Sequence, residues 1–171
     1  MKALNCSIVL FFLLVNVLVQ AETLEGKIVK IADGDTLTLL TSTKDQVKIR
    51  LAGIDTPERK QPFGNRAKQA LAKLAFQKQA LIEAETKDRY GRTVGVVFVD
   101  GLNVNHELVK QGMAWVYRKY TNDKALYELE SKAKKEKLGL WLQETPYHLG
   151  SGVELGVNQA KLSAWTGSCL Y

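Results

Sequence analysis

The stretch that decides the fold runs from Leu24 to Leu51 and reads LEGKIVKIADGDTLTLLTSTKDQVKIRL. Its apolar and β-branched residues gather in three runs, which are 24–31, 37–41 and 47–51. The turn-forming pairs Asp33-Gly34 and Lys44-Asp45 separate these runs. Short apolar runs bounded by such pairs are typical of strands joined by tight turns. The stretch therefore predicts a three-stranded meander.

The rest of the chain alternates between helical and strand patterns. Apolar residues recur at helical spacing in the set Ala67, Ala70, Leu71, Leu74 and Ala75. Strand patterns return over 80–85 and 93–100, and 113–117 is expected to be extended. Asn103 is expected to cap a second helix that runs through Gln111 and ends at Gly112. Asn122 or Asp123 is expected to cap a third helix, which carries Leu126, Leu129, Ala133 and Leu138.

This order of elements predicts the fold class. Three strands, a helix, two strands and further helices match the oligonucleotide/oligosaccharide-binding barrel, whose helix lies between the third and fourth strands. We therefore expect an α+β protein, mainly β, built as a five-stranded Greek-key barrel with about three helices. We expect residues 22–145 to form this domain and residues 146–171 to be a loosely ordered tail, because the chain becomes rich in Gly and Ser after Pro146.

The first 21 residues have the pattern of a secretory signal peptide. Lys2 precedes an apolar run over 8–19, and Val19-Gln20-Ala21 places small or apolar residues at a cleavage site. The run is short for a membrane span, which needs about 20 residues. We therefore expect cleavage after Ala21, a secreted or periplasmic protein and no stable membrane association afterwards. An uncleaved signal anchor is the alternative.

Charge and cysteine content add two constraints. Residues 22–171 carry 23 basic and 18 acidic residues, since only Lys2 of the 24 basic residues lies before position 22. A surplus of this size is compatible with an anionic partner and equally with simple solubility. After cleavage Cys169 would be the only cysteine, so we expect the core and not a disulfide to hold the fold, and we expect a monomer.

Acidic side chains cluster in two motifs at the ends of predicted strands. The first is Asp33-Gly34-Asp35-Thr36, and the second is Asp55-Thr56-Pro57-Glu58. Neighbouring strands would bring Asp35 and Asp55 together, and two adjacent carboxylates repel unless a proton or cation separates them. Carboxylate and carbonyl oxygens are ligands that Ca²⁺ prefers. The motifs therefore predict a Ca²⁺ site to which Asp35, Asp55 and the Thr56 carbonyl contribute, with Glu58 acting through water.

Two arginines accompany these acids. Arg50 precedes the second motif, and Arg92 ends a third, Asp88-Arg89-Tyr90-Gly91-Arg92. Guanidinium groups bind phosphate bidentately and stay charged at any working pH. A divalent cation, two arginines and a carboxylate base are the groups that phosphodiester hydrolysis needs.

Each motif alone has a simpler structural interpretation. Asp33-Gly34 suits a hairpin turn, Asp55-Thr-Pro-Glu58 suits a helix entry, and Tyr90-Gly91 suits a tight turn. The arginines could form surface ion pairs of little energetic weight. His106 and His148 are too few for a zinc site, and His106 is expected to be an exposed helix residue. Only the combination of motifs, in order, favours catalysis.

In this order the motifs resemble those of the staphylococcal nuclease (thermonuclease) family. The resemblance extends from Leu24 to Trp141 and includes Asn105-X-X-Leu-Val-X-Gln-Gly112 and Lys134-Lys-Glu-Lys-X-Gly-Leu-Trp141. It implies a Ca²⁺-dependent endonuclease that cleaves single- and double-stranded DNA and RNA with little sequence specificity and leaves 3′-phosphate ends.

The resemblance also implies roles for individual residues. Asp35, Asp55 and the Thr56 carbonyl would be direct Ca²⁺ ligands, with Asp33 in the outer shell. Glu58 would be the general base, and Arg50 and Arg92 the phosphate clamp. Substrate contacts would come from the following residues: Arg89, Tyr90, Tyr117 and Tyr120.

Two alternatives to a nuclease stay open. One is a non-catalytic nucleic-acid-binding barrel, and the other is an adhesion or structural barrel with a basic face. Neither needs acids beside two arginines, so the presence of all of these groups favours the enzyme.

Overall fold

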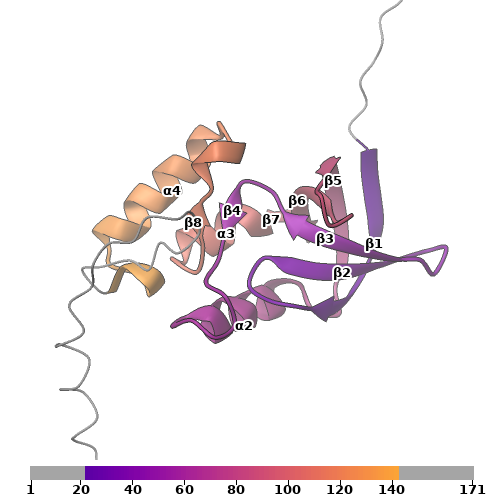
Figure 1. The fold of residues 1–171 in the computed structure, drawn as a ribbon, viewed down its shortest axis with the longest axis horizontal. Helices are drawn as coiled ribbons and strands as arrows, with labels where there is room; N and C mark the ends of the chain where they lie inside the picture. Colours follow the sequence, from indigo (N-terminus) through magenta and orange to yellow (C-terminus); the bar gives the residue numbers. More distant parts are fainter. Residues whose placement is uncertain (1–21, 143–171) are drawn as a thin grey trace, which may run out of the picture.

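The computed structural model describes residues 22–142, so the predicted signal peptide (1–21) and the predicted tail (146–171) lie outside the described part (Figure 1). The strands of the described part are β1 Glu22–Ile31, β2 Thr36–Thr41, β3 Gln46–Leu51, β4 Ile54–Asp55, β5 Gln79–Lys87, β6 Thr93–Val99, β7 Leu102–Asn103 and β8 Trp115–Val116. The helices are α2 Gly64–Ala75, α3 Val104–Lys110 and α4 Lys124–Lys135, with 3₁₀ turns η1 Arg118–Tyr120 and η2 Gly139–Leu142. No helix within residues 22–142 is long and apolar enough to span a membrane.

The five long strands close into a barrel. Their order is β3-β2-β1-β5-β6, all neighbours antiparallel, and a parallel pairing of β3 with β6 joins the two ends. In that pairing Arg50 lies opposite Val94 and Leu51 opposite Gly95. A helix follows the third barrel strand, as predicted, and the five-stranded mixed barrel with three helices confirms the expected fold class.

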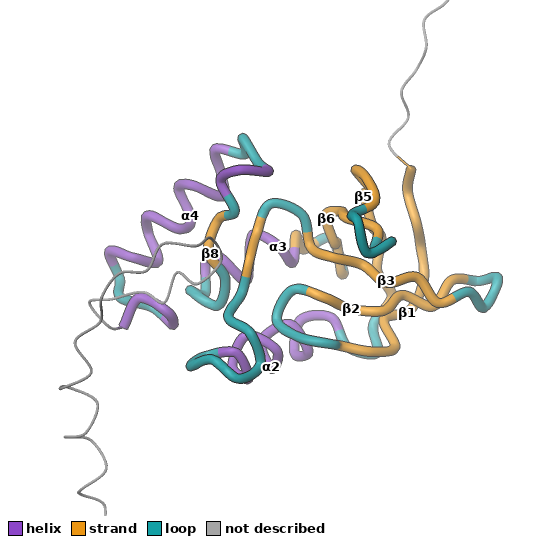
Figure 2. Tube along the Cα trace, in the orientation of Figure 1, coloured by secondary structure: helices purple, strands orange, loops and turns teal. Residues whose placement is uncertain are grey.

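The core forms where the inward residues of the strands meet the helices. Ile28, Leu39 and Ile49 are fully buried, and Leu71 of α2 and Leu108 of α3 pack into the same cluster. Each such side chain contributes about 1.5–3 kcal/mol through burial. Figure 2 shows α2 running along one end of the barrel and α4 lying beside β8, apart from the barrel strands, while α3 contacts both α2 and α4.

Two short strands connect the barrel to the C-terminal helices. β4 pairs antiparallel with β8, which places Asp55 opposite Trp115. Buried Asn105 of α3 adds a second connection: its Oδ1 accepts from the N–H of Val97 at 3.1 Å, and its Nδ2 donates to the carbonyl of Ala52 at 2.9 Å. The Asn105 motif therefore serves the fold, because it ties α3 to the closing edge of the barrel.

The helix caps follow the sequence closely. Asn103 caps α3 by accepting from the N–H of His106, and Asp123 caps α4 by accepting from the N–H of Ala125. Gly112 follows α3 at φ 67°, a left-handed conformation that glycine adopts without strain. Leu138, expected within the third helix, lies beyond its end at Lys135.

Candidate active site

Asp35 is held at the turn between β1 and β2. The N–H of Ala32 donates to the carbonyl of Thr36 at 2.8 Å, and the Asp35 carbonyl accepts from the N–H of Leu51 on β3 at 2.9 Å. Asp33 tightens the turn, because its Oδ1 accepts the N–H of Asp35 at 3.2 Å. These bonds fix the backbone of Asp35. The residue as a whole is only 6% exposed.

Gly34 allows this turn to approach the next motif. A Cβ at position 34 would lie 2.7 Å from both the Thr56 hydroxyl oxygen and the Ala67 Cβ, closer than side chains pack. The missing side chain therefore lets the first acidic motif contact the second. The Thr56 hydroxyl uses this approach to donate to Oδ2 of Asp35 at 3.1 Å.

Arg50 lies between the two acidic motifs. Its Nη2 is 2.8 Å from Oδ1 of Asp55 and 3.2 Å from Oδ2 of Asp35. Its Nη1 donates at 2.9 Å to the carbonyls of Leu51 and Ile54, which orients the guanidinium. One cation thus contacts two carboxylates, in a site where the Arg50 side chain is 14% exposed.

The charge in this cluster is incompletely balanced. Burial raises the pKa of Asp35 to about 7, and the negative charges of Asp33 and Asp55 add to the rise while Arg50 opposes it. Burial also raises the pKa of Asp55, again against the opposing effect of Arg50. When both acids are ionised, two carboxylates beside one guanidinium leave one negative charge without a charged partner, a cost that either a proton or a cation relieves.

Arg92 joins the cluster through a hydroxyl. Its Nη1 donates to the Thr36 hydroxyl at 3.2 Å, and that hydroxyl donates to Oδ1 of Asp35 at 3.0 Å. Asp88 anchors the other side of Arg92 by accepting from Nε at 2.7 Å. The Nη2 donors of Arg92 have no hydrogen-bond partner among residues 22–142, so they remain available for an anion.

Asp88 organises the whole Asp88–Arg92 turn. Its Oδ1 accepts the N–H groups of Tyr90 and Arg92, both at 2.9 Å. Burial alone would raise the pKa of Asp88, but these hydrogen bonds and the Arg92 guanidinium hold it below its ordinary value. Asp88 therefore stays ionised and keeps Arg92 oriented.

Comparison with known proteins assigns the chain to a family. Residues 48–143 match the family model described as "Staphylococcal nuclease homologue". The chain belongs to the staphylococcal nuclease family. It is similar to an "Uncharacterized endonuclease" of Haemophilus influenzae, at 41% identity over 145 residues that cover 85% of this chain and 81% of that protein.

Two further relatives agree with this assignment. A "Micrococcal nuclease" of Shigella flexneri is 42% identical over 68% of this chain and 72% of its own length. "Protein ParB" of Escherichia coli is 43% identical over 69% of this chain and 72% of its own length. The family resemblance expected from the motifs is confirmed, and the protein is a nuclease, a hydrolase of phosphodiester bonds.

Glu58 of the nuclease stands apart from the contacts described above. It lies three residues beyond Asp55, exposed to solvent, and its carboxylate makes no hydrogen bond or ion pair within the described part of the chain. The structure thus brings Asp35, Asp55, Arg50 and Arg92 into one network, whereas Glu58 is near this network through the short chain connection alone.

The aromatic residues expected to contact substrate fall into two groups. Tyr90 is 68% exposed, and Arg89 lies over its ring at 4.8 Å and donates to its hydroxyl at 2.7 Å. Tyr117 and Tyr120 form an edge-to-face pair with ring centroids 4.7 Å apart, and Tyr120 is 61% exposed. The backbone N–H of Tyr117 donates to the Gly53 carbonyl at 2.9 Å, so this pair stands beside the β3–β4 connection.

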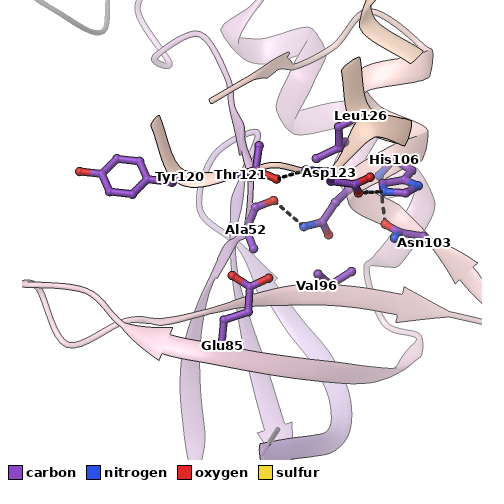
Figure 3. Close-up of a pocket in the computed structure, with 11 residues that line it drawn as sticks. Ala52, Glu85, Val96, Asn103, His106, Tyr120, Thr121, Asp123 and Leu126 are labelled. Atoms are coloured by element: carbon purple, nitrogen blue, oxygen red, sulfur yellow. Dashed lines mark hydrogen bonds and ion pairs between the residues drawn. The ribbon is translucent and has the colours of Figure 1, made fainter. Parts of the chain in front are cut away.

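A small pocket of about 90 Å³ lies beside this tyrosine pair (Figure 3). Its lining residues include Ala52, Glu85, His106, Tyr120 and Asp123, and none of the four networked catalytic candidates. Figure 3 shows the Glu85 carboxylate pointing toward Ala52, and the Tyr120 ring pointing away from the pocket into solvent. The pocket is thus separate from the acidic cluster, although both adjoin the β3–β4 connection.

His106 differs from its expectation as an exposed residue. Its side chain is 30% exposed, and its Nε2 lies 2.7 Å from Oδ2 of Asp123. This contact links the beginning of α3 to the N-cap of α4. Sequence reasoning missed it because the two residues are 17 positions apart and only the packing of α3 on α4 joins them.

The donor set of the cluster suits a hard cation. No group of three or more His, Cys, Asp or Glu side chains within residues 22–142 is close enough to form a complete cation cage by itself. Asp35 and Asp55 nevertheless offer two carboxylates that share one guanidinium, and burial raises the pKa of each. Oxygen ligands of this kind, completed by a backbone carbonyl and water, fit Ca²⁺.

Proposed function

We propose that this nuclease cleaves single- and double-stranded DNA and RNA in a Ca²⁺-dependent reaction with little sequence specificity. The observation that carries the proposal is the contact of a single Arg50 nitrogen with both Asp35 and Asp55. An excess of buried negative charge is unfavourable for stability, and a bound cation would remove the cost. A protein that only binds nucleic acid gains nothing from this arrangement.

Asp35, Asp55 and the Thr56 carbonyl would hold the cation, and Asp33 would act on it from the outer shell. When bound, Ca²⁺ supplies positive charge beside the reacting phosphate. The Thr56 hydroxyl, which donates to Oδ2 of Asp35, would keep that carboxylate oriented toward the site.

The arginines would bind and stabilise the phosphate. Arg92 presents unpaired Nη2 donors while Asp88 holds its Nε, so its fork is oriented before substrate arrives. Arg50 would contribute the second positive charge. Donors that are fixed in advance stabilise the charge that develops on the phosphoryl oxygens without further reorganisation.

Glu58 would act as the general base. Its exposed carboxylate has no protein partner within residues 22–142 and can accept a proton from the attacking water. The water oxygen would attack phosphorus as Glu58 takes its proton, and the P–O5′ bond would break with its electron pair passing to O5′. Arg92 would stabilise this oxygen by hydrogen bonding while it takes up a proton from solvent water and leaves as a hydroxyl. The products would be a 3′-phosphate and a 5′-hydroxyl.

Aromatic side chains would hold the flanking nucleotides. Base stacking on a ring tolerates every sequence, which suits a non-specific nuclease. The rings of Tyr90 and Tyr120 are exposed, and a base would stack on them by displacing the cations that lie over them, Arg89 at 4.8 Å and Lys119 at 5.4 Å. Tyr117 flanks Tyr120.

The test incubates protein that begins at Glu22 with single-stranded DNA in Ca²⁺ or in a chelator. We expect degradation only with Ca²⁺, and products that a 3′-phosphatase can modify. Glu58→Gln should lower turnover by at least ~100-fold, the scale of a lost general base, while Glu128→Gln on the exposed face of α4 serves as the matched control. Full degradation in chelator would refute the Ca²⁺ requirement, and binding without cleavage in Ca²⁺ would favour the non-catalytic barrel.

We also propose that the protein is exported and works outside the cytoplasm as a monomer. The apolar run over 8–19 and the small residues before position 22 support the export part of this proposal. The mature N-terminus, read by mass spectrometry of protein from the periplasm or medium, should be Glu22. An intact N-terminus on membrane-bound protein would indicate the signal anchor instead.

A further inference from the structure

The loop between β4 and α2 is short and internally bonded. It spans residues 56–63 and carries Glu58. The Glu58 N–H donates to Oε1 of Gln61 at 2.8 Å, and the Glu58 carbonyl accepts the N–H of Gln61, also at 2.8 Å. Both polar groups of the Glu58 backbone are therefore bonded to one residue, an arrangement like the reciprocal bonds of a capping box.

The end of the loop packs directly on Glu58. A Cβ at position 64 would lie 2.1 Å from the Glu58 carbonyl oxygen, a distance that only glycine avoids. The N–H of Gly64 donates to the Gln61 carbonyl at 3.1 Å, which continues the chain of bonds into the helix. Glu58, Gln61 and Gly64 thus form one closed turn.

Phe63 fixes this turn to the body of the protein. It adopts φ 66°, which non-glycine residues rarely do and which persists only where the surroundings determine it. Its ring packs on the cluster that contains Trp115, Leu140 and Trp141, and the Arg66 guanidinium covers it at 4.8 Å. The loop is therefore held in two ways: by the hydrogen bonds between Glu58, Gln61 and Gly64, and by the apolar packing of Phe63.

The Glu58 carboxylate contrasts with this well-held backbone. It makes no hydrogen bond or ion pair within residues 22–142 that could orient it, whereas Asp35, Asp55 and Arg92 are each held by side-chain hydrogen bonds. The position of this carboxylate consequently depends on where the loop backbone places the Cα of Glu58.

We propose that Gln61 is a positioning residue for catalysis, which acts by holding the backbone of Glu58 through its side-chain amide oxygen. The proposal rests on the proposed role of Glu58 as general base. The Gln61 side chain supplies the only acceptor for the Glu58 N–H within the described residues, and loss of that acceptor frees the loop to shift the carboxylate. A displacement of about 1 Å at a catalytic group costs on the order of 100-fold in rate.

The test compares two substitutions of similar shape in the full protein. Gln61→Met removes the acceptor, and we expect kcat to fall by ~10- to 100-fold while KM and the thermal midpoint stay close to those of the parent. Gln61→Glu keeps an acceptor oxygen at the same reach and should recover most of that turnover. Gln69→Met, on the exposed face of α2, is the control for a Gln-to-Met change and should leave kcat unaltered.

A double-mutant cycle separates positioning from a general structural effect. In the Glu58→Gln background, Gln61→Met should cause no further loss of kcat, because a positioning residue acts only through the group it positions. Equal fold-losses in both backgrounds would overturn the inference, as would an unchanged kcat for Gln61→Met alone. Full turnover of Glu58→Gln itself would instead refute the proposed base, and the inference with it.

Discussion

Two buried carboxylate clusters in this nuclease respond to burial in opposite ways. Around Arg50, one guanidinium contacts both Asp35 and Asp55, and the pKa of each acid is raised by burial. Glu130 on α4 is only 1% exposed, yet three donors balance its charge: Arg118 at 2.7 Å, Lys134 at 2.9 Å and the N–H of Val116 at 2.9 Å. Burial alone would raise the pKa of Glu130, but these donors lower it.

The difference teaches how to separate a binding site from a structural ion pair. Glu130 connects α4 to β8 through a hydrogen bond to the N–H of Val116. Its negative charge is balanced by donors from the protein itself, so it needs no ligand. The Asp35–Asp55 pair is left with one charge too many, which favours a cation from outside. We propose that unbalanced burial, more than burial itself, distinguishes the Asp35–Asp55 pair as the cation site.

The largest effect should follow from removing Arg50. Arg50→Met would leave Asp35 and Asp55 facing each other without a partner, and the loss of one member of a buried ion pair costs about 3–5 kcal/mol. Urea unfolding in chelator would measure this loss. Saturating Ca²⁺ should reduce it, whereas a loss that Ca²⁺ does not change would contradict the assignment of the site.

Arg92 should affect catalysis more than folding. Arg92→Ala is expected to lower turnover by at least ~100-fold, about 2.7 kcal/mol in the activation free energy, since its unpaired Nη2 donors would stabilise the phosphate in the proposed reaction. Single-turnover kinetics on a defined oligonucleotide would measure the loss in the rate of cleavage. Lys132→Ala on exposed α4 provides the control, and comparable losses in both variants would point to general electrostatics.

Glu130 should matter for stability and for its pH dependence. Glu130→Gln is expected to lower the free energy of unfolding by about 1–3 kcal/mol at pH 7, because a charged hydrogen-bond partner is lost. The pKa of Glu130 is lower in the folded than in the unfolded state, so its contribution is complete above the unfolded value near 4.5 and disappears as the pH falls through the folded value. The difference in the free energy of unfolding between parent and variant should therefore become smaller in acid. A difference that stays constant from pH 7 to pH 3 would contradict this account.

The smallest effect should be a gain in stability. Asp35→Asn removes one of two repelling acids, so we expect the protein in chelator to become more stable by about 0.5–2 kcal/mol while cleavage is lost. The thermal midpoint with and without Ca²⁺ would show the gain. The matched change Asp45→Asn, on an exposed turn, should not stabilise the protein, and destabilisation by Asp35→Asn would mean that Arg50 fully balances both acids.

Local sequence was sufficient to predict most elements. The runs over 24–31, 37–41 and 47–51 became β1 to β3 with shifts of at most two residues at their ends. The cap at Asn103 could be predicted, and that of α4 narrowed to Asn122 or Asp123, because capping is a contact between residues two or three apart; the structure shows that Asp123 is the cap. Periodicity and capping are local properties of the chain, so they can be recognised without knowledge of the tertiary fold.

Side-chain partners were less predictable. The motifs indicated that Asp35, Asp55 and Arg50 would meet, but the sequence did not indicate that the Thr36 hydroxyl would connect Arg92 to them. The closed turn of Glu58 and Gln61 was also missed, although the three-residue spacing of a capping box could have suggested it. Such contacts depend on rotamers and on distances between strands, which no pattern encodes.

The sequence by itself predicted the strand segments, their order along the chain and the charged residues at the ends of those strands, because hydrophobic period and turn chemistry act over a few residues. Only the tertiary structure decided which charge remains unbalanced: the closure of β3 on β6 and the close approach at Gly34 bring two carboxylates to one guanidinium. Burial and distance, which set the electrostatic free energy, exist only once the chain has folded.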